Sequence, residues 1–299
     1  MKNILILGSS GFIGKSLFEH LNKFYFKKIK SISLVQRTKK KFNFNNKNSL
    51  IKTNLIIKDF RNIKKLPKCD TIIYCIRSKH IKESLIIFSH FKNLIKNKKK
   101  IKIIFLSSGA VYGVNKKKEK LKETKKIDID KINLLKGYKK EYAKQKLLLE
   151  NKFYKLSKLG FSISVARCFA FYGENILDTN FYISKIINLM KSKKNTIKIQ
   201  NLRHIYRSYM HSFDLCECII SILTNSDKKF QIYNVGSDQA INLNNLTKKI
   251  SKRFEKKIII NTSKFEREVD YYIPSTKKVK KKLKLKTKFD LNKIISNLS

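Results

Sequence analysis

The chain has 299 residues, 42% of them hydrophobic, and a formal net charge of +48 from 69 Lys and Arg against 21 Asp and Glu. This length suits one large α/β unit or two closely joined domains. No stretch approaches the ~20 apolar residues of a membrane span, which excludes a membrane-spanning class. An N-terminus that already resembles a strand leaves no room for a cleaved signal, so we expect a cytoplasmic protein.

The predicted elements alternate between strands and helices along the chain. This alternation predicts an α/β fold, a Rossmann-type doubly wound parallel sheet, with a smaller C-terminal substrate-binding region. We expect a dinucleotide-binding domain over residues 1–173 and a mainly substrate-binding region over 174–299, with a late strand near 231–236 returning to the sheet. The predicted strands are Asn3–Leu7, Ser31–Val35, Ile51–Ile57, Thr71–Cys75, Ile101–Ser107, Ser162–Arg167 and Ile232–Val235, and the predicted helices are Gly11–Asn22, His80–Lys96, Tyr138–Ser157, Tyr182–Lys191, Phe213–Leu223 and Leu243–Phe254.

Three glycines follow the first predicted strand at steps of three residues, Gly8, Gly11 and Gly14. Gly8 allows a tight turn, Gly11 allows backbone amides to approach phosphate oxygens, and Gly14 allows close packing of the helix on the strand. The helix N-terminus offers unpaired N–H groups and a partial positive charge. The pattern predicts a site for a dinucleotide pyrophosphate; the alternative is a glycine-rich turn that binds nothing.

Tyr142 and Lys146 are four residues apart on a predicted helix, so their side chains share one face. A nearby ammonium group favours the phenolate form, and we expect it to lower the pKa of Tyr142 from its ordinary value of about 10. The tyrosine could then exchange a proton with an alcohol while hydride moves at the carbon. Ser108 directly follows the predicted strand Ile101–Ser107, at the end where ligands of parallel sheets bind, and could hydrogen-bond the reacting oxygen. The alternative is a surface Tyr–Lys pair that arises by chance in a lysine-rich chain.

These motifs together resemble the extended short-chain dehydrogenase/reductase family of nucleotide-sugar epimerases, dehydratases and reductases. The resemblance implies that Ser108, Tyr142 and Lys146 are catalytic and that related enzymes are commonly homodimers. It implies that Arg207, in Arg207-Ser-Tyr-Met-His-Ser-Phe-Asp214, binds the diphosphate of the nucleotide sugar, with Arg267 as a second diphosphate arginine. It also implies contacts with the cofactor by Gly8, Ser10, Gly11, Phe12, Ile13, Gly14, Tyr142, Lys146 and, at the adenine, Asp59.

The chain departs from the family pattern at three places. Gln36-Arg37 stands where members that prefer NAD carry an acid, and an arginine suits a 2′-phosphate, so NADP is slightly favoured over NAD. Ile76-Arg77 replaces a small pair near the cofactor and could crowd or contact the pyrophosphate. Gly109-Ala110 stands where the dehydratases have Asp-Glu, so we do not expect dehydration.

The lysines are distributed over every predicted helix and loop, with many Ile and Asn and only 2 Pro. The favoured residues have A/T-rich codons, so genome composition is the simpler cause of the charge. Nonspecific affinity for polyanions would follow in either case. The five cysteines, Cys69, Cys75, Cys168, Cys216 and Cys218, are expected to be reduced, buried packing residues, and no metal site is predicted.

We therefore expect an NAD(P)-dependent nucleotide-sugar epimerase or 4-ketoreductase that transfers hydride at the sugar C4, with Tyr142 as acid/base. The alternative from another class is a non-catalytic basic Rossmann-fold protein that binds RNA or scaffolds a complex. The charge and the Ile76-Arg77 departure favour the alternative, while the joint presence of Ser108, Tyr142 and Lys146 opposes it.

Overall fold

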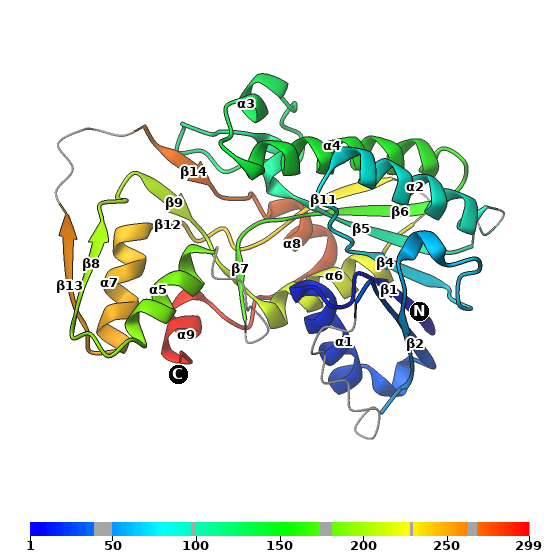
Figure 1. Ribbon diagram of the computed structural model, residues 1–299, viewed down its shortest axis with the longest axis horizontal. Helices are drawn as coiled ribbons and strands as arrows, with labels where there is room; N and C mark the ends of the chain where they lie inside the picture. Colours follow the sequence, from blue (N-terminus) through cyan, green and yellow to red (C-terminus); the bar gives the residue numbers. More distant parts are fainter. Residues whose placement is uncertain are drawn as a thin grey trace.

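The computed structural model describes residues 1–38, 50–96, 98, 100–173, 181–227, 230–261 and 268–298. Its centre is a seven-stranded parallel sheet with the order β11-β6-β5-β4-β1-β2-β3 (Figure 1). From β1 the chain adds β2 and β3 on one side of the sheet, and from β4 it adds β5, β6 and β11 on the other. The carboxyl ends of β1 and β4 therefore form the switch point at which such sheets bind ligands. The strands are β1 (Asn3–Leu7), β2 (Ser31–Gln36), β3 (Lys52–Ile57), β4 (Thr71–Tyr74), β5 (Lys102–Ser108), β6 (Ser162–Cys168) and β11 (Gln231–Val235). The predicted Rossmann-type sheet is confirmed.

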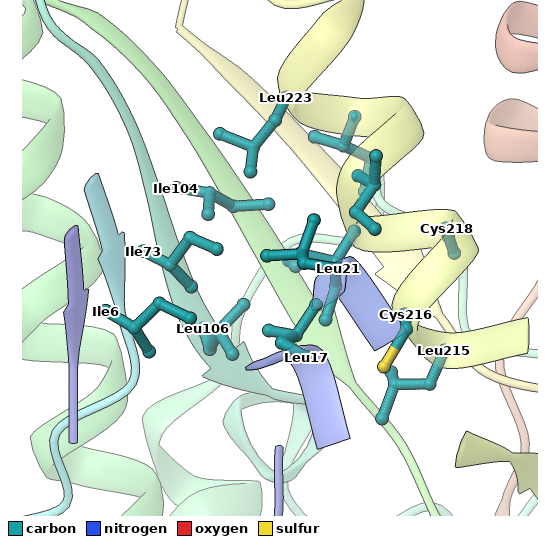
Figure 2. Close-up of a cluster of buried hydrophobic side chains, with 14 of the residues drawn as sticks. Ile6, Leu17, Leu21, Ile73, Ile104, Leu106, Leu215, Cys216, Cys218 and Leu223 are labelled. Carbon is teal, nitrogen blue, oxygen red and sulfur yellow. The ribbon is translucent and has the colours of Figure 1, made fainter. Parts of the chain in front are cut away.

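Helices cover both faces of the sheet, because successive side chains of a buried strand point to opposite sides. Ile6 of β1 belongs to the core shared with α1 (Phe12–Phe24) and α6 (Ser212–Thr224), whereas Leu5 and Leu7 belong to the core shared with α2 (Ile81–Ile95) and α4 (Tyr138–Ser157). Figure 2 shows the first core, in which strand residues face the helices. Its labelled residues are Ile6, Ile73 and Ile104, with Leu106, Leu17, Leu21, Leu215, Cys216, Cys218 and Leu223.

The five cysteines are free, as expected, but they are not all buried. Cys168, Cys216 and Cys218 are buried, and burial raises the pKa of each thiol. Cys69 and Cys75 are half-buried, so the expectation of five buried residues was wrong for these two. Cys75 lies at the end of β4, where the strand leaves the core, and its thiol donates to the Leu7 carbonyl oxygen at 2.9 Å.

A smaller region follows the main run of strands and packs around its own core, formed by α5 (Tyr182–Met190), α7 (Leu243–Arg253) and α9 (Leu291–Ser296). Short strands join it: β8 (Thr196–Gln200) pairs with β13 (Lys257–Asn261), β9 (Ile205–Arg207) lies between β12 (Ile241–Asn242) and β14 (Asp270–Tyr272), and β7 (Phe171–Tyr172) pairs with β10 (Met210–His211). The remaining helices are α3 (Ile129–Asn133) and α8 (Lys277–Leu283). In the described part of the chain, no helix is both long and apolar enough to cross a membrane.

Candidate active site

The three glycines of the first loop each occupy a position with a different steric demand. Gly8 has a φ of +85°, and an added Cβ would lie 2.9 Å from the Cys75 carbonyl oxygen. A Cβ on Gly14 would lie 2.6 Å from the Gly8 carbonyl oxygen, so strand and helix approach as closely as the motif predicts. Gly11 differs, because a Cβ there would meet only one carbonyl oxygen at 3.5 Å. The space above Gly11 is therefore open to a ligand.

The N-terminus of α1 fits an anionic group such as a pyrophosphate. Among the described residues, no side chain caps this helix end, and its first turn holds no acidic residue. The aromatic ring of Phe12 is stacked on Phe171 at 4.9 Å, and Ile13 packs against the core, so these two residues offer their backbone rather than their side chains. Ser10 lies in the half-exposed turn before the helix.

The structure brings Ser108, Tyr142 and Lys146 together at the carboxyl end of β5. Ser108 is the last residue of β5, and its side chain accepts a hydrogen bond from the Ala110 N–H at 3.2 Å. Lys146, 4% exposed, donates from Nζ to the Leu106 carbonyl oxygen at 2.8 Å and lies 5.7 Å from the Tyr142 ring centroid. The spacing of four residues on α4 thus places both side chains toward the strand end.

Burial controls the protonation of both groups. Burial raises the pKa of Tyr142, while a hydrogen bond with Ser108 and the charge of Arg77 act in the opposite direction. The net shift is upward, so the expectation of a lowered tyrosine pKa was wrong, because the loss of solvation outweighs the charge of Arg77 and the hydrogen bond with Ser108. Burial also lowers the pKa of Lys146 to about 8. Near pH 7 the phenol is therefore protonated, and the buried amine is still mostly protonated.

Arg77 adds a second cation to this group. It is exposed, and its guanidinium carbon lies 5.4 Å from the Tyr142 ring centroid and 5.8 Å from that of Tyr138. Cations within about 6 Å of an aromatic centroid are attracted to the ring. The sequence marked Arg77 only as a departure from the family pattern. The structure shows that its side chain lies over the rings of Tyr138 and Tyr142.

Tyr272 of β14 also faces Ser108, a position that the sequence did not reveal. Burial raises the pKa of Tyr272, and a hydrogen bond with Ser108 acts in the opposite direction. Its ring packs 4.7 Å from Phe169, and Phe169 lies against Gly109, where an added Cβ would approach the ring to 2.6 Å. The residue after Ser108 must therefore be small while Phe169 keeps this position.

Arg207 connects β9 to the same tyrosine. Its guanidinium carbon lies 5.6 Å from the Tyr272 ring centroid, its Nη2 donates to Asp270 Oδ2 at 2.6 Å, and its Nη1 donates to the Tyr206 carbonyl oxygen at 2.7 Å. The arginine predicted to hold a diphosphate thus borders the Ser108 group and is paired with an acid. Arg267 lies outside the described residues.

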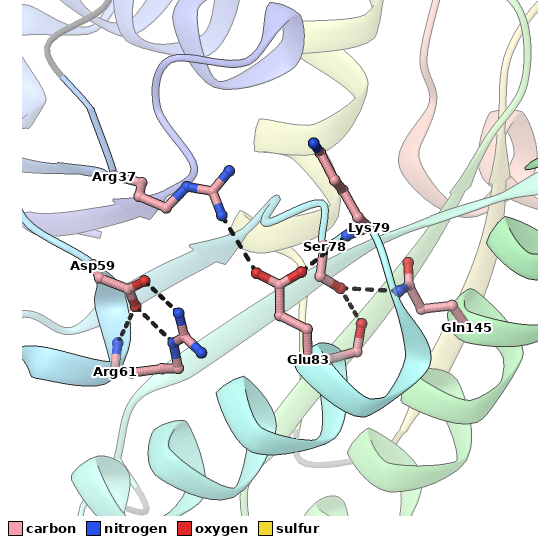
Figure 3. A network of polar contacts seen from close by, with 8 residues as sticks. Arg37, Asp59, Arg61, Ser78, Lys79, Glu83 and Gln145 are labelled. Carbon is pink, nitrogen blue, oxygen red and sulfur yellow. Dashed lines mark hydrogen bonds and ion pairs between the residues drawn. The ribbon is translucent and has the colours of Figure 1, made fainter.

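The predicted adenosine contacts lie at the ends of β2 and β3 (Figure 3). Asp59 accepts from Arg61 Nε at 3.0 Å and Nη2 at 2.8 Å, and Arg61 holds the pKa of Asp59 at about 2. Arg37 forms an ion pair with Glu83, with Nη1 3.4 Å from Oε1. Both predicted residues are therefore at this end of the sheet, but each already has a partner of opposite charge.

A buried network supports the strand ends beneath the site. Arg167 donates from Nη1 to the Tyr112 hydroxyl at 2.9 Å and forms an ion pair with Glu150 at 2.6 Å, and the Tyr112 hydroxyl donates to Asn234 Oδ1 at 2.9 Å. The Ser107 hydroxyl donates to Glu150 at 2.5 Å. The side chain of Arg167 is 4% exposed and is thus held within this network.

The profile of the NAD dependent epimerase/dehydratase family matches residues 4–236, which includes the glycine loop, the Ser108 group and the returning strand β11. The chain belongs to this family. No curated protein matches the sequence.

Solved structures of similar enzymes share the fold over almost the whole chain. The dTDP-glucose 4,6-dehydratase of Bacillus anthracis, in complex with NAD, has a TM-score of 0.78 at 18% identity and covers 100% of this chain and 95% of its own. The UDP-glucose 4-epimerase of Bifidobacterium longum, in complex with NAD+ and UDP, has a TM-score of 0.76 at 16% identity, with 99% and 96% covered. The UDP-N-acetylglucosamine 4-epimerase of Bacillus cereus has a TM-score of 0.75 at 16% identity, with 100% and 98% covered.

Proposed function

We propose that this family member is an NAD(P)-dependent nucleotide-sugar epimerase or 4-ketoreductase that transfers hydride at the sugar C4. The observation that carries the proposal is the convergence of Ser108, Tyr142 and Lys146 at the end of β5, beside a glycine loop that fits a pyrophosphate. The solved enzymes with NAD bound share this fold, which supports a dinucleotide at the same end of the sheet. When bound, the nicotinamide would supply or accept the hydride.

Four side chains of this protein have the remaining roles in proton exchange and binding. Tyr142 is the group that exchanges a proton with the 4-oxygen, and Ser108 hydrogen-bonds that oxygen. Lys146 holds the nicotinamide ribose, and Arg207 binds the diphosphate of the substrate through a planar fork of donors. Because the raised pKa keeps Tyr142 protonated at neutral pH, the phenol is prepared to donate, which is the direction that reduction of a 4-ketone needs.

Dehydration finds less support than epimerisation or reduction. Gly109 follows Ser108, and the ring of Phe169 fills the space that a larger side chain would need. An acid could not occupy position 109 without displacement of Phe169. The proposal is therefore limited to hydride transfer with proton exchange by Tyr142.

Turnover of a panel of UDP-, dTDP-, GDP- and CDP-sugars, with and without added NADPH, tests the proposal. A reductase consumes one NADPH per product, whereas an epimerase converts substrate without net consumption. Mass spectrometry of the native protein for a co-purifying dinucleotide is a second test, and size-exclusion chromatography tests the expected homodimer. Absence of both a bound dinucleotide and any turnover would contradict the proposal.

The alternative, a basic scaffold that binds RNA, is favoured by the net charge of +48. Binding through charge alone weakens steeply as salt rises and shows no sequence preference. We expect that behaviour in an RNA titration over a salt series. Sequence-selective RNA binding that survives physiological salt, with no binding of sugar nucleotides, would favour the scaffold instead.

A further inference from the structure

The arginine that follows β2 is paired with an acid from a different element. Arg37 Nη1 lies 3.4 Å from Oε1 of Glu83, which belongs to the first turn of α2 (Figure 3). The other oxygen of Glu83, Oε2, accepts a hydrogen bond from the backbone N–H of Lys79 at 3.0 Å. The Glu83 side chain is 21% exposed and that of Arg37 is 61% exposed. The helix therefore fixes the carboxylate, and the arginine reaches across the end of the sheet to it.

Two carboxylates are paired with two guanidinium groups around Arg37. Asp59 and Glu83 contribute two carboxylates, and Arg37 and Arg61 contribute two guanidinium groups. Asp59 is ionised at neutral pH, because its hydrogen bonds with Arg61, and to a smaller extent the charge of Arg37, hold its pKa at about 2. This differs from a basic cradle, in which several unpaired donors face an incoming phosphate.

We propose that Glu83 is a residue that sets the choice between NAD and NADP in this chain. By pairing with Arg37, Glu83 occupies donors that a 2′-phosphate would need, and its own charge repels that phosphate. The pair therefore reduces the preference for NADP that an arginine at this position would otherwise produce. The inference rests on the proposed function only in requiring that a dinucleotide binds.

The strength of the pair predicts a shift in preference rather than a complete block. Ion pairs at exposed positions are weak and are screened by salt, so a phosphate can compete for Arg37. A phosphate monoester carries a charge of about −1.5 to −2 near neutral pH, whereas the 2′-hydroxyl of NAD carries none. The carboxylate of Glu83 should therefore affect NADP binding and leave NAD binding nearly unchanged.

A double-mutant cycle on dinucleotide binding tests the proposal. Dissociation constants of NAD+ and NADP+ are measured by calorimetry, at constant salt and after removal of bound nucleotide, for the unmodified protein, Glu83→Gln, Arg37→Gln and the double variant. Glutamine keeps the size of the side chain and can still accept from Lys79, and thermal melting confirms that each variant is folded. Glu255→Gln removes the same charge from an exposed turn of the C-terminal region and serves as the matched control.

We expect Glu83→Gln to tighten NADP+ binding by about three- to fivefold, with little effect on NAD+. In the Arg37→Gln background the same change should alter NADP+ binding by less than about twofold, because the guanidinium that Glu83 occupied is gone. The inference is overturned if Glu83→Gln leaves the NADP+/NAD+ ratio unchanged, if its gain persists without Arg37, or if Glu255→Gln gives the same gain. Binding of neither dinucleotide would remove this inference and the proposed function together. The expected shift without turnover of any sugar nucleotide would remove the proposed function alone.

Discussion

Glu150 and Arg167 join helix α4 to strand β6 through a buried ion pair. Arg167 Nη2 donates to Glu150 Oε2 at 2.6 Å, its Nε donates to Oε1 at 3.0 Å, and both side chains are at most 5% exposed. Glu150 follows Tyr142 and Lys146 by steps of four residues on α4, so all three share the face that meets the sheet. The pair therefore holds the helix in the position that brings the phenol to Ser108.

Loss of one partner of this pair should destabilise the fold. Glu150→Ala leaves a buried guanidinium without its carboxylate, which typically costs about 3–5 kcal/mol. Urea unfolding measures the change. Glu268→Ala is a control, because its pair with Lys116 is exposed and should contribute less than about 1 kcal/mol. A Glu150→Ala protein as stable as the control would show that the network is not needed for the fold.

Lys146 should make stability depend on pH. Its pKa in the folded protein is about 8, below the ordinary 10.5, so the unfolded chain binds more protons between these values and the free energy of unfolding rises with pH across that window. The difference corresponds to about 3 kcal/mol. Lys146→Met removes the buried amine, so the variant should be more stable than the unmodified protein at pH 7, by less than this amount because the bond to Leu106 is lost.

The gain from Lys146→Met should shrink as pH rises from about 8 through 10.5, because above the ordinary pKa of 10.5 the amine becomes neutral in both states. Urea unfolding of both proteins at pH 7 and pH 10 tests this, since the many other lysines titrate equally in the two and cancel in the difference. A gain of the same size at both pH values would mean that the Lys146 amine is not destabilised by burial.

Tyr142→Phe should lower turnover by roughly 10²–10⁴, because it removes the proton donor while keeping the ring. Dinucleotide affinity should change little, since the hydroxyl is assigned to the reacting oxygen. The measurements are turnover of the substrate found in the panel and dinucleotide titration of the same preparation. Normal turnover in the phenylalanine variant would refute the assignment of Tyr142.

Arg77→Gln should shift the pH dependence of the reaction rather than abolish it. The charge of Arg77 favours the phenolate of Tyr142, so its removal should raise the pKa of Tyr142 further. In the direction that oxidises the 4-hydroxyl, which needs the phenolate, the rate rises with pH as the phenol ionises, and this ascending limb should move to higher pH. Lys79→Gln is the control. It removes the charge of a nearby exposed lysine that does not shift the pKa of Tyr142, so the rate profile should stay in place.

The main sheet could be predicted because its central strands are apolar runs separated by amphipathic helices, as β1, β5 and α1 illustrate. The short strands β7, β9, β12 and β14 have two or three residues each, which is too few to show a period of two. Tyr272 belongs to one of them, and its approach to Ser108 depends on long-range packing that no local motif encodes.

Charge and solvation were the other quantities that the sequence could not supply. Arg37 and Glu83 are 46 residues apart and meet only because α2 begins beside the end of β2. Likewise, the spacing of Tyr142 and Lys146 identified two neighbours on one helix face, but the direction of the tyrosine pKa depends on how far the strand end excludes water. Motifs identify which groups meet along one element, whereas packing between elements sets their charge state.

Arg207 provides a prediction on substrate affinity that involves its acidic partner. A diphosphate would compete with Asp270, which holds the guanidinium at 2.6 Å, and would gain from the two donor nitrogens of the fork. Arg207→Ala should raise the Michaelis constant for the nucleotide sugar far more than the surface change Lys117→Ala. Asp270→Asn should lower that constant severalfold, because it removes the competing charge and keeps the size of the side chain. Equal Michaelis constants in the Arg207→Ala and Lys117→Ala proteins would show that the diphosphate binds elsewhere.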